Sequence, residues 1–226
     1  IIMKKFLIVL LAMALTVSLA SCSKDEENVT GSVETSTQTS AETDEAFEKG
    51  GVSQQTYKNE FIGIGCTLDD DWTFYTDDQI AQLNGIAADA MDEEVAEMIA
   101  NATIIYDMFA ENTATAENVN INLEKLTRTK VLMLDIETMF KSQTPSLKST
   151  YENMGATEFS YTIEKTSFTG KDQVSMKVKA KINGVDMYQT MVALKTGQYL
   201  TNICATSYQT DTTEEVLGKF FSLGNN

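Results

Sequence analysis

Carboxylates are the side chains of this chain that could do acid–base or metal chemistry, because the 226-residue sequence contains no histidine. Without histidine there is no Ser-His or Cys-His nucleophile pair, and the commonest zinc and copper ligand is missing. Asp69-Asp70-Asp71 offers the hard oxygen ligands that calcium prefers, but its spacing is not that of an EF-hand loop. A solvated turn is the commoner role of such a run, so we predict no metal site and no cofactor.

Pairs of carboxylates could also serve as the acid and base of a hydrolase. Asp77-Asp78 and Asp92-Glu93-Glu94 stand where first helical turns are expected, and the helix dipole already accounts for acids there. The carboxylate separation of roughly 5–9 Å that glycoside hydrolysis needs is a three-dimensional property. We therefore predict a protein without enzymatic activity, and a carboxylate-based hydrolase or glycan-active enzyme is the alternative.

Two sets of side chains could form an interaction surface. The first is an aromatic set, made of Trp72, Phe74 and Tyr75. The second is the only basic stripe, made of Lys177, Lys179 and Lys181. The aromatic set could be a platform for carbohydrate or peptide, and the lysines could contact an anionic partner. The commoner roles are core packing for the aromatic set and, for the lysines, a solvated sheet face paired with acids across a hairpin.

Residues 1–22 have the composition of an export signal. Lys4 and Lys5 make a positive start, an apolar run extends from Phe6 to Leu19, and Leu19-Ala20-Ser21-Cys22 places small residues before a thiol. The apolar run is shorter than the roughly 20 residues that a membrane-spanning helix needs. The ending resembles the lipobox of bacterial lipoprotein precursors, which is read by a diacylglyceryl transferase and a lipoprotein signal peptidase.

The lipobox resemblance implies that residues 1–21 are a signal peptide and that Cys22 carries the lipid. Two or three acyl chains anchor firmly, since each buried methylene adds roughly 0.8 kcal/mol. The predicted location is the extracytoplasmic face of a membrane, at the cell surface or in the periplasm. Ser23-Lys24-Asp25-Glu26-Glu27 also resembles the Lys-acid-acid surface-export signal of Bacteroidetes lipoproteins, although an acidic linker start explains it equally well.

The net charge argues against nucleic acid as a partner. Removal of residues 1–21 takes away two of 17 basic residues, Lys4 and Lys5, and none of the 33 acidic ones, which leaves a net charge of −18. Such a surface repels nucleic acid and anionic headgroups. The partners we expect are the membrane, through Cys22, and an envelope protein or small ligand.

Composition divides the rest of the chain into two parts. Residues 22–56 are rich in Ser, Thr, Glu and Asp, with Phe47 as their only aromatic residue, and we predict a disordered tether. Residues 57–226 have a single proline and regular apolar periodicity, which indicates one domain of natural size.

The first half of the predicted domain reads as strands followed by helices. Alternation from Phe61 to Leu68 predicts a strand whose glycines mark a bulge or a close neighbour. A short strand is expected at Trp72–Tyr75, and Thr76-Asp77-Asp78-Gln79 is a capping box that opens a helix. A second helix is expected to begin at Asp92.

The middle of the chain predicts a hairpin and then helix. Residues 103–111 and 119–126 are its strands, and a helix is expected over about 130–142. Thr144-Pro145 reads as the N-cap and first position of a separate shorter helix that ends near Met154.

The segment 157–206 predicts a four-strand meander with turns at Thr169-Gly170, Asn183-Gly184 and Thr196-Gly197. Parity requires that Phe159, Tyr161 and Ile163 share a side with Val174, Val178 and Ile182, while Glu164 and Lys177 share the other. Asp211-Thr212-Thr213-Glu214 is expected to cap a closing helix that includes Phe220 and Phe221. The fold class is therefore α+β, with an antiparallel sheet of about six to eight strands packed between helices.

A family resemblance covers the start of the domain. Tyr57-Lys58-Asn59-Glu60-Phe61-Ile62-Gly63-Ile64, followed by Leu68 and Trp72-Thr73-Phe74-Tyr75, is similar to the opening of Mog1/PsbP-like domains in bacterial lipoproteins. The departure is Asp69-Asp70-Asp71, where the family commonly has a proline. The resemblance implies an accessory or interaction role and no catalytic residue that could be carried over.

Cys66 and Cys204 are the thiols of the predicted domain. A disulfide needs Cα atoms within about 7 Å, and nothing in the sequence requires that their strands are neighbours. Free cysteine is commonly a small buried apolar residue, so we predict two separate buried thiols. The prediction for the whole chain is a lipid-anchored, non-enzymatic binding or assembly module.

Overall fold

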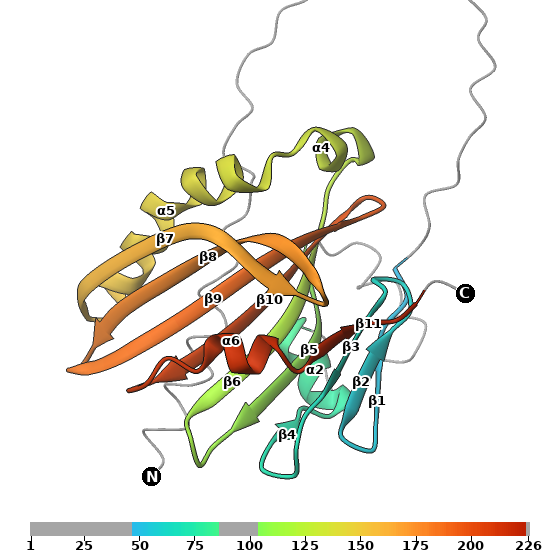
Figure 1. Ribbon diagram of the computed structural model, residues 1–226, viewed down its shortest axis with the longest axis horizontal. Helices are drawn as coiled ribbons and strands as arrows, with labels where there is room; N and C mark the ends of the chain where they lie inside the picture. The colour runs from blue at the N-terminus through green and yellow to red at the C-terminus, as the bar shows by residue number, and fades with distance from the viewer. Residues whose placement is uncertain (1–46, 86–103, 225–226) are drawn as a thin grey trace, which may run out of the picture.

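The computed structural model describes residues 47–85 and 104–224 and shows an α+β fold with two antiparallel sheets (Figure 1). The larger sheet has seven strands and the smaller has four. The predicted fold class is confirmed, and the four-stranded sheet is an addition that is not predicted from the sequence. The helix predicted from Asp92 lies outside the described residues. None of the described helices is long and apolar enough to cross a membrane.

The seven-stranded sheet joins a hairpin to a meander. In spatial order its strands are β4 (Thr73–Phe74), β5 (Ile104–Asn112), β6 (Glu117–Lys125), β10 (Tyr199–Tyr208), β9 (Val185–Thr196), β8 (Lys171–Ile182) and β7 (Ala156–Phe168). The turns Thr169-Gly170 and Asn183-Gly184 have φ between +51° and +80°, the positive values that two-residue hairpin turns require. The hairpin β5–β6 and the meander β7–β10 are both confirmed, but the last turn is Gly197-Gln198 rather than Thr196-Gly197, because Thr196 pairs with Tyr199.

The register of β7 and β8 agrees with the parity prediction. Tyr161 lies opposite Val178, and Thr162 lies opposite Lys177. The connecting turn holds two residues, an even number, so the odd-numbered apolar set of β7 shares a face with the even-numbered set of β8.

The four-stranded sheet is built from the two ends of the described chain. Its order is β1 (Gly51–Ser53), β2 (Thr56–Asn59), β3 (Ile64–Thr67) and β11 (Phe220–Ser222). Strand β1 falls within residues 22–56, so the end of the segment expected to be a tether is a strand instead. The Phe47 ring packs on Phe61, with ring centroids 5.7 Å apart, which is apolar burial that composition alone does not predict.

The strand predicted from Phe61 to Leu68 is shorter in the structure. Residues before Ile64 form a tight turn in which Gly63 has φ +71° and its N–H donates to the Asn59 carbonyl. Gly65 does have the close neighbour predicted, since a Cβ there would meet the Phe221 ring at 2.5 Å. Only glycine leaves room for that ring.

Helix boundaries follow the caps. Helix α2 (Asp77–Leu83) begins at the predicted capping box, with Thr76 and Gln79 each bonding to the other's backbone N–H. The single helix predicted over about 130–142 is divided between two helices in the structure. Helix α4 (Arg128–Met133) ends early, and Asp135 caps a new helix by accepting from Thr138 N at 2.8 Å.

The prediction that Pro145 starts a separate helix is wrong. Helix α5 (Ile136–Asn153) continues through Pro145, and the Thr144 hydroxyl donates to the Phe140 carbonyl at 3.0 Å instead of capping. Packing of its buried face against the sheet offsets the lost backbone hydrogen bond. The predicted end near Met154 is confirmed, with Gly155 at φ +90°.

The closing helix is shorter than predicted. Helix α6 (Thr213–Leu217) ends before Gly218, and Phe220 and Phe221 belong to β11 rather than to the helix. Pairing of β11 with β3 satisfies their backbone groups, an option that local periodicity cannot show.

The two faces of the seven-stranded sheet carry separate cores. Helix α5 covers one face through Met139, Phe140, Leu147 and Tyr151. The four-stranded sheet and α6 supply the other core, which includes Tyr57, Cys66, Val216, Leu217 and Phe220.

Candidate functional site

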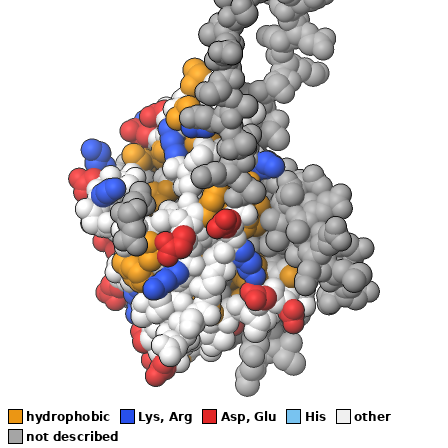
Figure 2. Space-filling model, turned by 90° about the vertical axis from the view of Figure 1, so that its right-hand side faces the viewer, with side chains coloured by type: hydrophobic (Ala, Val, Ile, Leu, Met, Phe, Trp, Pro, Cys, Tyr) orange, Lys and Arg blue, Asp and Glu red, His pale blue; other side chains and the backbone are white. Residues whose placement is uncertain are grey.

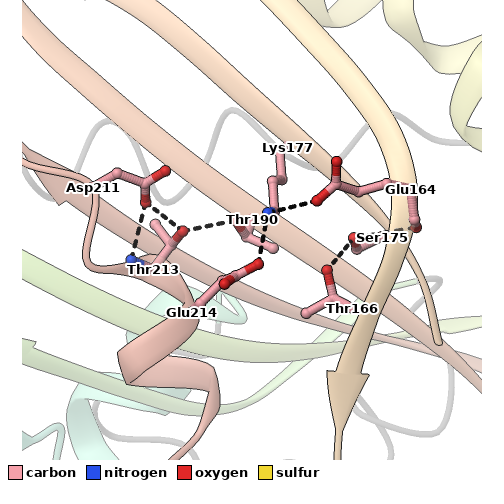
Figure 3. A network of polar contacts seen from close by, with 8 residues as sticks. All are labelled: Glu164, Thr166, Ser175, Lys177, Thr190, Asp211, Thr213 and Glu214. Atoms are coloured by element: carbon pink, nitrogen blue, oxygen red, sulfur yellow. Dashed lines mark hydrogen bonds and ion pairs between the residues drawn. The ribbon is translucent and has the colours of Figure 1, made fainter. Parts of the chain in front are cut away.

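Lys177 is the centre of a polar network on the sheet face that carries α6 (Figure 3). Its ammonium lies 2.6 Å from a carboxylate oxygen of Glu164 on β7 and 2.6 Å from one of Glu214 on α6. The Lys177 side chain is only about a quarter exposed, so the protein shields this double ion pair from most of the solvent. It ties an edge strand and a helix to β8.

Hydroxyl groups extend the same network. The hydroxyls of Thr190 and Thr213 are 2.7 Å apart, and the Asp211 carboxylate accepts from Thr213 N at 3.1 Å and Thr213 Oγ1 at 2.7 Å. The predicted start of α6 is confirmed, but its cap is not: Thr212 is the N-cap and makes no side-chain cap hydrogen bond, whereas Asp211 bonds to Thr213, the first residue of the helix. Thr166 and Ser175 share a hydrogen bond of 2.7 Å between β7 and β8.

The charge state of Lys177 decides what this network can do. The hydrogen bonds to Glu164 and Glu214 raise the pKa of Lys177, so the amine stays protonated at neutral pH. A protonated amine cannot accept the proton of the Ser175 hydroxyl, which activation of a serine nucleophile requires. The arrangement is therefore a tie between elements.

The other two lysines of the stripe are also paired. Lys181 lies 3.3 Å from Glu158 and 3.6 Å from Asp186, and Lys179 lies 3.8 Å from Asp186. Lys179 also stands 5.2 Å above the centre of the Tyr188 ring. The interpretation of a sheet face with lysines paired to acids across hairpins is confirmed, and contact with an anionic partner stays a prediction.

The aromatic set does not form one platform. Trp72 is only 4% exposed and belongs to the core, while Phe74 and Tyr75 are half-buried. Tyr75 packs on Phe109, with ring centroids 4.4 Å apart, in a cluster separate from that of Trp72. Burial of its large apolar area explains why Trp72 is unavailable to a carbohydrate or peptide.

Asp69-Asp70-Asp71 forms a turn that is tied to the end of the chain. Asp69 accepts from Lys219 Nζ at 2.8 Å, and this hydrogen bond lowers the pKa of the Asp69 carboxyl. Asp69 also accepts from Asp71 N at 3.3 Å. Within the described residues no group of three or more potential metal ligands is assembled.

Asp107 is a buried carboxylate that is not among the site residues predicted from the sequence. It lies at a register shift of β5 and is 4% exposed. It accepts hydrogen bonds from the Tyr57 hydroxyl, from Asn59 Nδ2 at 2.7 Å and from Gly50 N at 2.9 Å. The groups facing it are thus a phenol, an amide and a backbone N–H. This cluster ties the four-stranded sheet to β5.

The pKa of Asp107 makes stability depend on pH. Burial raises that pKa despite the lowering effect of Tyr57 and Asn59, so the folded state binds a proton more readily than the unfolded state. The free energy of unfolding should therefore fall as pH rises through this raised pKa. Urea unfolding between about pH 4 and pH 7 should show this slope in the native chain and less of it in Asp107→Asn. Equal slopes would contradict the assignment.

A row of polar side chains lies on the α5 side of the large sheet. Asn118, Asn120 and Asn122 alternate with apolar residues along β6 and are at most 4% exposed. Asn202 Nδ2 donates to Asn122 Oδ1 at 3.2 Å, and Asn122 Nδ2 donates to Asn120 Oδ1 at 3.3 Å. We call these four residues the asparagine row.

A second chain of hydrogen bonds runs beside the asparagine row. Tyr151 on α5 donates to Gln189 Oε1 at 2.5 Å, and Gln189 Nε2 donates to Thr206 Oγ1 at 3.0 Å. Thr206 lies opposite Asn118, and Cys204 lies opposite Asn120, so both chains share one face.

Three polar atoms on this face lack a hydrogen-bond partner within the described part of the molecule. They are Nδ2 of Asn118, Nδ2 of Asn120 and the hydroxyl of Tyr208. Burial raises the pKa of Tyr208, so its hydroxyl keeps its proton. All three can donate, and a buried donor without an acceptor costs about 1–3 kcal/mol. The face is therefore suited to a molecule that supplies acceptor oxygens.

The alternation of β6 is visible in the sequence, but its meaning is not. Alternating polar positions are typical of the solvated side of a strand, whereas the structure buries these. The sequence does contain one indication of this burial, because residues 118, 120 and 122 carry amide side chains rather than charged ones. Charged side chains are the usual occupants of an exposed strand face.

Cys66 and Cys204 are both buried and free, which confirms the prediction of separate thiols. They belong to different cores, on opposite sides of the large sheet. Burial raises the pKa of each thiol to about 12.

Thiol labelling checks this directly. In Cys22→Ala, the denatured and unreduced protein should show two reactive thiols, and the native protein should react slowly because thiolate is scarce and shielded. Absence of reactive thiols after denaturation would show a disulfide instead.

The fold and these sites define an α+β protein with two antiparallel sheets and a buried polar face. No protein-family model matches the chain, and no curated protein matches it in sequence. The resemblance to Mog1/PsbP-like domains therefore stays a prediction.

Two solved structures are similar in chain trace. One, from Bacteroides thetaiotaomicron VPI-5482, is 10% identical with a TM-score of 0.42 over 74% of this chain and 48% of that one. The other, LpqN of Mycobacterium tuberculosis, involved in cell envelope biogenesis, is 10% identical with a TM-score of 0.38 over 70% of this chain and 82% of that one. This chain spans about half the length of the first structure. Neither similarity identifies a function for this chain.

Proposed function

We propose that the protein is an extracytoplasmic lipoprotein, anchored through acylated Cys22, whose domain binds a small polar ligand without transforming it. The anchor rests on the sequence Leu19-Ala20-Ser21-Cys22 after a basic start and an apolar run. Binding rests on one observation: the unpartnered donors of Asn118, Asn120 and Tyr208 on one face of the sheet.

The chemistry of the three donors defines the ligand class. Two amide N–H groups and a protonated phenol are neutral donors, so they match carbonyl or hydroxyl oxygens such as those of a sugar or a peptide. Buried polar groups without a partner are rare in native proteins and call for an explanation. A bound ligand would satisfy them.

The enclosure of the asparagine row favours a small ligand over a protein surface. Asn118 and Asn120 are each 1% exposed. A flat protein partner cannot reach donors at that depth, whereas a small molecule enclosed by the domain can.

The anchor is tested by Cys22→Ala in cells fed a labelled fatty acid. The native protein should take up label and fractionate with membranes, because two or three acyl chains give firm anchoring. The variant should accumulate as precursor or released protein without label. Continued labelling of the variant would refute the assignment, and Cys204→Ala serves as a control that should keep its label.

Ligand binding is tested by native mass spectrometry of protein purified from its own envelope. Bound ligand should appear as added mass on the native protein, and this added mass should disappear on denaturation. It should also be absent from Asn118→Leu, because leucine has a similar shape to asparagine but no donor. Glu215→Gln, an exposed change on α6, should retain the added mass. Added mass that Asn118→Leu retains would place the ligand elsewhere.

A further inference from the structure

Helix α4 presents the most exposed apolar side chains of the described chain. Leu132 is 71% exposed and Met133 is 80% exposed, whereas Val131 is the buried residue of this helix. Leu134 then turns back toward the α5 core, and its carbonyl accepts from Lys195 Nζ. Figure 1 shows α4 projecting beyond the large sheet, and Figure 2 shows apolar side chains exposed at this upper end of the molecule.

The surroundings of α4 are basic on an acidic molecule. Residues 125–134 include Lys125, Arg128 and Lys130 and no acidic residue, in a chain of net charge −16. All three basic residues are exposed, and Lys195 adds a fourth cation beside Leu134. Asp135 is the adjacent acid, and its carboxylate caps α5.

The described chain begins at the same end of the sheet. The Phe47 ring packs 6.1 Å from the Tyr199 ring, between centroids, and Tyr199 lies opposite Lys125, the last residue of β6 before α4. The described chain therefore begins at the end of the sheet from which the chain enters α4. Cys22 is separated from Phe47 by the 24 residues 23–46, and the coil that their composition predicts would span about 25–30 Å on average.

We propose that α4 lies against the membrane that holds the anchor, with Leu132 and Met133 in the interface and the basic residues near anionic headgroups. This inference rests on the proposed lipid anchor. An anchor at the same end keeps α4 at high effective concentration near the bilayer, so a weak contact suffices. Two exposed side chains are too few for a stable protein interface of about 800 Å² per partner, but a bilayer surface needs no matching shape.

The test attaches a fluorescent probe at α4. Met133→Cys is labelled with an environment-sensitive dye, while Cys66 and Cys204 stay unlabelled because they are buried. A hexahistidine tag replaces Cys22 and holds the chain, from residue 23 onward, on vesicles of phosphatidylcholine, phosphatidylglycerol and nickel-chelating lipid. Because this attachment does not need acylation, failure of the Cys22 assay and failure of the α4 contact are distinguishable.

The matched control is Val185→Cys. Val185 is also an exposed apolar residue, but it stands at the end of β9 farthest from Thr196, which lies opposite Tyr199. On vesicles the probe at 133 should shift to shorter wavelength and be quenched by doxyl-labelled lipid, and the probe at 185 should do neither. Without the tag, Lys130→Gln should lower affinity for the same vesicles about fivefold. Equal responses at 133 and 185, or shielding at 133 by solubilised envelope protein but not by vesicles, would overturn the proposal.

Discussion

Asp107→Ala should lower the free energy of unfolding by about 3 kcal/mol, since it leaves several buried donors without an acceptor. Those donors are the Tyr57 hydroxyl, the Asn59 amide and Gly50 N, all of which converge on this carboxylate. Relief from burying a carboxylate offsets part of the loss. Urea unfolding measures the change, and hydrogen exchange should accelerate in β1 and β2, which the cluster ties to β5.

Two variants separate this effect from a general loss of charge. Asp107→Asn keeps one acceptor oxygen and the shape of the side chain, so it should cost less than Asp107→Ala. Asp70→Ala removes an exposed carboxylate and should stay within about 0.5 kcal/mol of the native chain. An Asp107→Ala protein as stable as Asp70→Ala would show that the cluster contributes nothing.

Asn118→Leu should raise the free energy of unfolding of the ligand-free protein by about 1–2 kcal/mol, because it removes a buried donor that has no partner. A gain in stability together with a loss of ligand is the signature of a residue kept for binding. Thermal and urea unfolding of the ligand-free protein measure the gain in stability.

The control lies on the same strand and the same face. Asn122→Leu should lower stability by about 2 kcal/mol, since Asn122 donates to Asn120 and accepts from Asn202. Opposite signs for the two substitutions are expected although both exchange asparagine for leucine. If both substitutions change the free energy of unfolding in the same direction, the missing hydrogen-bond partner of Asn118 has no effect on stability.

Local chemistry determines the parts of the fold that the sequence predicts correctly. Asn183-Gly184 sets a turn, Thr76 and Gln79 set a helix start, and alternation in β8 sets a register. Each of these signals acts within a few residues of the structure it determines.

The errors lie where distant segments meet. Phe220 pairs in a strand because β3 is available about 150 residues earlier, and Pro145 stays inside α5 because the helix packs on a sheet formed later in the chain. Asp107 is acceptable in an apolar strand only because Tyr57 and Asn59 reach it. The candidate site was missed for the same reason: burial of the asparagine row is a tertiary property.

Strand β7 has a consequence for the lipid-anchored state that we propose, in which many copies share one membrane. It is an edge of the large sheet and is 13 residues long, so its outer backbone groups could template pairing with a neighbouring molecule. Glu158, Glu164 and Lys165 are exposed along β7, and the two glutamates are paired with lysines of β8. If β7 of a second molecule paired with this edge, its charged side chains would lie beside these charges and repel those of the same sign. The residues whose ion pairs join β7 to β8 therefore also oppose edge-to-edge aggregation between neighbouring molecules.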